Sequence, residues 1–195
     1  MNVSHPLVVS ALLLNLLLQG CAPVLIGGAA TGASVAHDRR TAGSYVEDQS
    51  IEMKAATAIS NEAELKRQGH LNVTSFNMIV LISGEVPSEA LRQRAGELIG
   101  GIEKVRRVHN ELMIAAPSSM MTRSSDSLIT AKVKTSLFSV KGYENFDPTR
   151  VKVVTENGTV FLMGLLTRAE GAATAITASG VGGVQRVVKL FEYMD

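Results

Sequence analysis

The stretch "VKVVTENGTVFLMG", residues 151–164, decides the fold of this chain, because a related stretch, "LNVTSFNMIVLISG", occupies residues 71–84. In both, two runs of β-branched and aliphatic residues flank a short polar turn, which is the pattern of a β-hairpin. Asn157-Gly158 suits the positive φ angles of a type I′ turn. Met78 replaces that glycine in the first copy, so we expect a looser or differently shaped turn there.

The similarity extends to both sides of the hairpin. Residues 51–59 ("IEMKAATAI") match residues 129–137 ("ITAKVKTSL"), and both segments keep one apolar seam at helical spacing. Asp48 and Asp126 precede them at equivalent positions, where a carboxylate suits a helix N-cap. Downstream, each copy continues with a capped helix and a valine-rich strand. Residues 167–170 ("TRAE") fit a capping box at the start of this helix in the second copy, and Ser88 is the corresponding cap in the first. The repeated unit is therefore helix, strand, strand, helix, strand.

The leading segment has the pattern of an exported lipoprotein. Residues 7–18 form an apolar run of twelve, interrupted only by Ser10 and Asn15. This run is too short to span a hydrocarbon core of about 30 Å, but it has the length of a secretory h-region. It leads into "LQGC", residues 18–21, which resembles a bacterial lipobox. That resemblance implies acylation of Cys21 and cleavage before it.

These features predict an α+β protein of two tandem αββαβ domains. Since a strand–helix–strand connection is right-handed, each domain would be a three-stranded mixed sheet packed on two helices. The expected organisation is a signal peptide over 1–20, a lipidated flexible tether over 21–47, a first domain over 48–114, a linker over 115–125 and a second domain over 126–195.

Composition argues against several functional classes. Lys and Arg total 19 against 18 Asp and Glu, and aromatic residues make up 4% with no Trp, so we expect no nucleic-acid partner. The single Cys and the scattered His residues lack metal-ligand spacing, so no metal and no cofactor are predicted. No catalytic set is recognisable, and we expect a protein that is not an enzyme. Asp38, Arg39 and Arg40 would be a solvated charged segment or a strip that docks on a domain.

Each copy, with its hairpin, glycine, helix and a final "GVxxV" motif, resembles the BON domain. The motif reads "GGVQRV" at residues 182–187, and residues 102–108 ("IEKVRRV") correspond to it. Two copies behind a lipobox and "HDRRTAGSYVEDQSIE", residues 37–52, resemble the dual-BON outer-membrane lipoproteins of the DolP type. The resemblance implies a lipid-anchored, periplasm-facing protein of the bacterial outer membrane that binds anionic phospholipid and supports outer-membrane integrity.

A membrane-binding face is expected only in the second copy. There, the side of the first helix that faces away from the core carries a weakly apolar stripe with a lysine on each edge. The matching positions of the first copy are mostly polar: Ser50, Met53, Thr57 and Ser60. The residues predicted to bind phospholipid are Ser127, Leu128, Ala131, Lys132, Lys134, Thr135 and Phe138.

Two interpretations of this stripe remain open, since exposed apolar patches mark protein and membrane partners alike. The stripe could meet an anionic phospholipid membrane, or it could pack against the first domain or the linker. An alternative function is a non-enzymatic protein-interaction adaptor for an envelope assembly machine. In that case the partner would be an outer-membrane assembly protein, and an exposed strand edge could accept one of its strands.

Overall fold

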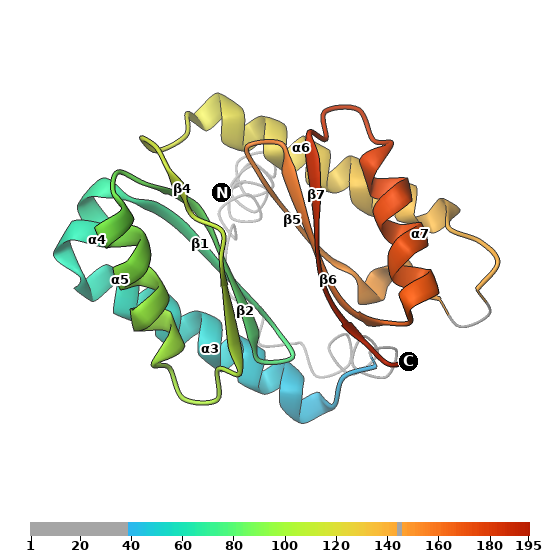
Figure 1. Cartoon of the computed structure of the whole chain (residues 1–195), viewed down its shortest axis with the longest axis horizontal. Helices are drawn as coiled ribbons and strands as arrows, with labels where there is room; N and C mark the ends of the chain where they lie inside the picture. Colours follow the sequence, from blue (N-terminus) through green and yellow to red (C-terminus); the bar gives the residue numbers. More distant parts are fainter. Residues whose placement is uncertain (1–38, 144–145) are drawn as a thin grey trace, which may run out of the picture. The chain divides into compact units, whose positions relative to one another are not determined.

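The computed structural model describes residues 39–143 and 146–195 of the chain (Figure 1). The predicted signal peptide and the acylation site at Cys21 lie outside these residues. Within the described residues, no helix is both long enough and apolar enough to cross a membrane.

The first domain is a mixed sheet with its helices on one face. Its elements are α3 (Ala42–Asn61), α4 (Ala63–Gln68), β1 (His70–Phe76), β2 (Ile79–Val86), α5 (Glu89–Gly100), β3 (Arg107–Asn110) and β4 (Met113–Ile114). β1 and β2 form the antiparallel hairpin, and both β3 and β4 pair parallel to β2. The short helix α4 and the interruption between β3 and β4 were not predicted.

The second domain repeats this arrangement with fewer interruptions. Its elements are α6 (Met120–Ser136), η1 (Leu137–Ser139), η2 (Pro148–Arg150), β5 (Lys152–Glu156), β6 (Thr159–Leu166), α7 (Arg168–Ser179) and β7 (Arg186–Tyr193). β6 pairs antiparallel to β5 and parallel to β7, which places β6 in the centre. The predicted α+β fold of two αββαβ units is confirmed.

The prediction that Asp48 and Asp126 are helix N-caps is wrong. The side chains of Thr41 and Ser119 cap α3 and α6 instead, about two turns further upstream. The C-terminal parts of the predicted tether and the predicted linker are therefore helical. The sequence signal was ambiguous because Ser, Thr and Asp all suit an N-cap, and only the packing of the helix decides which of them is used.

The two aspartates hold the hairpin turns. Asp48 and Asp126 lie within α3 and α6, and their side chains are buried. Each carboxylate accepts hydrogen bonds of 2.7–2.9 Å from the two backbone amides at the tip of its own hairpin: Asn77 and Met78 for Asp48, Asn157 and Gly158 for Asp126. These bonds join the first helix of each domain to its hairpin.

The hairpin turn of the first domain has the same shape as that of the second. Both central residues of each turn have positive φ: 52° and 63° at Asn77 and Met78, 48° and 69° at Asn157 and Gly158. The prediction of a different turn around Met78 is therefore wrong. A side chain in the left-handed region costs about 1–2 kcal/mol, and the bond from the Met78 amide to Asp48 helps to hold that conformation.

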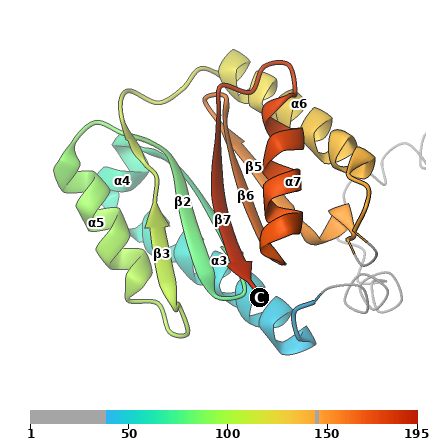
Figure 2. The same cartoon turned by 45° about the vertical axis from the view of Figure 1, so that its right-hand side comes forward.

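The two sheets pack against each other through the faces that the helices leave uncovered (Figure 2). This contact forms a buried cluster of Phe76, Ile79, Leu81, Phe161, Met163 and Leu190. The opposite faces of the same strands face the helices, through residues such as Val80 and Val160. β2 and β6 are thus buried on both sides, which explains their nearly continuous apolar sequences.

We expect Phe161→Ala to destabilise the protein by about 3–5 kcal/mol, because it leaves a cavity between the sheets. Phe161 is 2% exposed. Phe138→Ala is the matched control, since Phe138 is 66% exposed and its loss should change stability by about 0.5 kcal/mol or less. The measurement is chemical denaturation of the chain from Ala22 onwards. Equal effects of the two substitutions would contradict the sheet-to-sheet packing.

Candidate functional site

The predicted membrane-binding residues lie together on the outer face of α6 and of the 3₁₀ turn η1 that continues it. The two large apolar side chains of this set are well exposed, Leu128 at 64% and Phe138 at 66%. The others are exposed as well: Ser127, Ala131, Lys132, Lys134 and Thr135. We call these seven residues the α6 outer face. Phe138 was expected on the helix itself, but α6 ends at Ser136 and Phe138 lies in η1.

The opposite side of α6 holds this face in place. Ile129, Val133 and Leu137 are buried in the core of the second domain, in agreement with the predicted apolar seam. Asp126 ties the same helix to the hairpin turn. The α6 outer face therefore sits on a helix whose orientation is determined by its own domain, and it is open to solvent rather than covered by the first domain or the linker.

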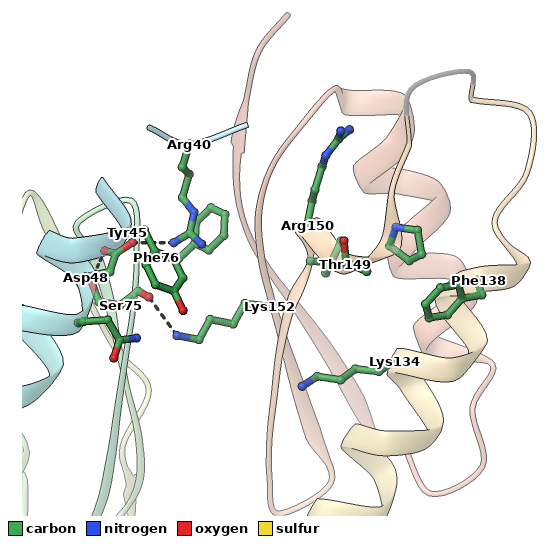
Figure 3. Close-up of a pocket in the computed structure, with 13 residues that line it drawn as sticks. Arg40, Tyr45, Asp48, Ser75, Phe76, Lys134, Phe138, Thr149, Arg150 and Lys152 are labelled. Atoms are coloured by element: carbon green, nitrogen blue, oxygen red, sulfur yellow. Dashed lines mark hydrogen bonds and ion pairs between the residues drawn. The ribbon is translucent and has the colours of Figure 1, made fainter. Parts of the chain in front are cut away.

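A cavity of about 410 Å³ lies beside the α6 outer face (Figure 3). Lys134 and Phe138 line it from that face, and Lys152 at the start of β5 points across it toward the first domain. The Nζ atom of Lys152 lies 2.8 Å from Glu52 Oε1 and donates to the carbonyl of Ser75 at 3.2 Å. The cavity thus lies where the two domains meet.

Two neighbouring arginines dock on different domains. Arg39 forms a two-pronged ion pair with Glu170 of the second domain, at 2.6 and 2.7 Å, and donates to the carbonyl of Leu165. The guanidinium of Arg40 donates to Asp48 of the first domain at 2.7 Å and lies 3.9 Å from the ring centre of Phe76. For Arg39 and Arg40, docking is the expectation that the structure shows. Asp38 lies outside the described residues.

Arg39 also changes the acidity of its partner. Its hydrogen bonds to Glu170 hold the pKa of that carboxyl below its usual value, in opposition to burial. Glu170 simultaneously accepts the backbone amide of Thr167 at 2.8 Å in the predicted capping box, which is confirmed. One carboxylate therefore both caps α7 and anchors the segment that precedes α3.

A buried polar cluster also joins the domains. Nδ1 of His70 lies 3.2 Å from Glu85 and 3.8 Å from Glu156 of the second domain. Burial raises the pKa of Glu156. Although burial opposes it, hydrogen bonds from the Ser118 amide, Asn157 and His70 lower the pKa of Glu85.

The same three side chains place their donor atoms within 4.8 Å of one another, which is close enough for a divalent cation. Their carboxylates already accept hydrogen bonds, in Glu85 from Asn157 and in Glu156 from Asn72. A metal ion would have to replace part of this network. In the part of the chain that the structure describes, we therefore interpret the cluster as a contact between domains.

Sequence reasoning found the α6 outer face but missed the residues that surround it. Lys152, Arg150 and the aromatic pair Tyr45 and Phe76 line the cavity from elements that lie far apart in the sequence. Arg39 and Arg40 were considered, but the sequence held no signal for their partners.

The family model for the BON domain matches residues 47–116 and 125–195. The chain belongs to the BON family. It is 40% identical over 192 residues to the outer membrane lipoprotein DolP of Haemophilus influenzae, covering 97% of this chain and 98% of that protein. This likeness supports an outer-membrane lipoprotein with two BON domains.

Two further relatives share most of this length. A 21 kDa hemolysin of Actinobacillus pleuropneumoniae is 36% identical over 158 residues, covering 81% of this chain and 80% of that protein. The osmotically-inducible protein Y of Escherichia coli is 27% identical over 160 residues, covering 80% and 77%. The likeness to proteins with different names thus extends over about four fifths of this chain.

We expect Glu170→Gln to destabilise the protein by about 2–4 kcal/mol at pH 7, because it removes the buried negative charge that accepts two hydrogen bonds from the Arg39 guanidinium. The folded pKa of Glu170 is depressed, so its contribution is complete above the unfolded carboxyl pKa of about 4.3 and is lost as the pH falls through the folded value. Stability of the variant should therefore decline less on acidification.

The control is Glu89→Gln, which removes an exposed pair with Arg92 and should cost about 0.5 kcal/mol or less. Parallel acid curves for Glu170→Gln and the unmodified chain would contradict this.

Proposed function

We propose that the chain is a lipoprotein held in the outer membrane by acyl chains on Cys21, with its BON domains facing the periplasm. In this proposal the second BON domain binds anionic phospholipid through the α6 outer face and so supports outer-membrane integrity. The lipobox-like residues 18–21 and the likeness to a protein named outer membrane lipoprotein support the anchor. Because two or three acyl chains hold a protein firmly on a bilayer, the second domain needs only a modest affinity of its own.

The observation that carries the proposal is the solvent exposure of Leu128 and Phe138 beside two lysines. These side chains are 64% and 66% exposed, and Lys132 and Lys134 are exposed on the same helix. Burying a large apolar side chain is worth about 1.5–3 kcal/mol when it is complete. Each lysine near an anionic surface adds about 1 kcal/mol. Together these contributions suit a helix that lies in the headgroup region.

The first domain does not offer the same chemistry on α3. The positions that match the α6 outer face are Ser50, Met53, Thr57 and Ser60, among which only Met53 is apolar. Charge differs in the same direction: residues 50–114 carry eight basic and eight acidic side chains, and residues 127–195 carry eight and six. The proposed function is one of binding, without catalysis, cofactor or nucleic acid.

A second candidate function, the protein-interaction adaptor, is favoured by the edge of the first sheet. Met113 and Ile114 of β4 are 47% and 54% exposed, and Met120 and Met121 at the start of α6 are both 83% exposed. Methionine is common on surfaces that adapt to several partners. A partner strand from an outer-membrane assembly protein could pair with β4.

We expect Leu128→Glu to weaken binding to phosphatidylglycerol vesicles at least about tenfold, because it removes an apolar contact and adds a repelled charge. Lys132→Glu should weaken it by a similar factor. The matched control is Met53→Glu, which places the same charge at an exposed apolar position of α3, 66% exposed. The measurement is vesicle co-sedimentation with the chain from Ala22 onwards, which contains every described residue. All three variants should keep their melting temperature, since the altered side chains are exposed.

The result that rejects the proposal is equal loss of binding in Met53→Glu and Leu128→Glu, or no binding of the unmodified protein to anionic vesicles. Crosslinking in isolated envelopes tests the adaptor. A single protein partner that persists in Leu128→Glu and disappears in Met113→Glu favours the second candidate function over the first.

A further inference from the structure

The cavity beside the α6 outer face has walls from both BON domains (Figure 3). The second domain contributes Lys134, Phe138 and the segment from η2 to the start of β5. The first domain contributes α3, through side chains such as Gln49, and the end of β1 with Phe76. Its volume of about 410 Å³ lies within the range of small-ligand sites in proteins, about 300–1,000 Å³.

Positive charge predominates among the described residues that line this cavity. The basic side chains are Arg40, Lys134, Arg150 and Lys152, and the acidic one is Asp48. Close to the lining, Glu52 also pairs with Lys152. Asp147 is a third acidic neighbour, since its carboxylate accepts hydrogen bonds from the lining residue Thr149. Four positive charges therefore meet three negative ones when these two neighbours are counted. A site of this balance, partly enclosed by protein, favours an anionic ligand.

The acidic side chain in the lining is already occupied. The carboxylate of Asp48 accepts hydrogen bonds from Arg40 at 2.7 Å, from the Ser75 hydroxyl at 2.6 Å and from both turn amides of its hairpin. Its negative charge is therefore dispersed into the first domain. The flexible cations of the second domain, Lys134 and Lys152, have ammonium groups directed to the cavity (Figure 3).

The position of the cavity identifies which anion suits it. Lys134 at the end of α6 and Phe138 in η1 belong both to the α6 outer face and to the cavity lining. A lipid that rests its apolar part near Phe138 would therefore have its phosphate at the mouth of the cavity. A free phosphate ion would use the same cations but would gain nothing from the aromatic side chain.

We propose that the cavity receives the phosphodiester headgroup of an anionic glycerophospholipid, so that the first BON domain forms one wall of the lipid site. Lys134, Arg150 and Lys152 surround the phosphate, and Phe138 remains at the level of the lipid glycerol. This inference rests on the proposed function and extends it, because the α6 outer face alone would need nothing from the first domain. It makes lipid recognition a property of the domain pair.

The test places a charge on the first-domain wall of the cavity without altering α6. Gln49→Glu is nearly isosteric, and Gln49 is exposed, so the fold should persist. Its matched control is Gln93→Glu, the same change at an exposed position of α5. With phosphatidylglycerol vesicles, we expect Gln49→Glu to weaken binding about fivefold, the factor expected for one charge near the headgroup, and Gln93→Glu to leave it unchanged.

A second pair of variants removes cations from the second domain. Arg150→Gln with Lys152→Gln should weaken vesicle binding about tenfold or more. Arg186→Gln with Lys189→Gln removes the same charge from β7, on the opposite side of the central strand β6, and should have a much smaller effect, since charges are screened beyond about 8 Å at physiological salt. Melting temperatures exclude a loss of fold. Binding of the same variants is also measured with phosphatidylcholine vesicles, with inorganic phosphate and with soluble glycerophosphoglycerol.

The amide resonances of Gln49, Ser75 and Phe76 report directly on the first-domain wall. Their shift with glycerophosphoglycerol and with phosphatidylglycerol supports the proposal, and an equal shift with inorganic phosphate overturns its assignment to a lipid. If anionic vesicles bind and shift only α6 resonances, with Gln49→Glu unaffected, the headgroup site is wrong while the proposed function stands. If the unmodified chain binds no anionic vesicle, the proposed function itself fails.

Discussion

The packing of one sheet on the other is the contact on which the rest of this structure depends. It buries Phe76, Leu81, Phe161 and Met163 between the domains, so the central strands β2 and β6 have apolar side chains on both faces. Such a contact resembles a shared core, because it consists of buried apolar side chains from both sheets. It explains why the helices occupy the outer faces, and why α6 presents its outer face to solvent instead of to the first domain.

Ion pairs and hydrogen bonds also join the two domains, beside this apolar packing. The pairs of Arg39 with Glu170, of Lys152 with Glu52 and of His70 with Glu156 join residues of different domains or of the segment before α3. Apolar contacts are not directional, whereas an ion pair or a hydrogen bond requires one geometry. We infer that these pairs select a single arrangement of the sheets among those that the apolar faces allow.

The two copies differ on the outer face of their first helix while they keep one internal design. Asp48 and Asp126 hold equivalent hairpin turns with equivalent bonds, although one turn contains Met78 where the other contains Gly158. The outer helix faces differ, since α6 has Leu128 and Phe138 where α3 has polar residues. The proposed lipid site uses this difference: one copy meets the membrane, and the other supports the headgroup from behind.

The sequence by itself determined the repeat, the αββαβ order, the hairpin in the second copy, the capping box and the exposed side of α6, because hydrophobic period and turn chemistry are local properties. It misplaced the starts of α3 and α6, because Ser, Thr and Asp all suit a helix N-cap. It misjudged the turn at Met78, because that turn is held by Asp48, which is distant in the sequence. The partners of Arg39 and Arg40, the burial of both faces of β2 and the basic cavity were settled only by the tertiary structure. Apart from the bond between Arg40 and Asp48, which spans eight positions, each of these requires residues separated by tens of positions to meet, and no local pattern contains that information.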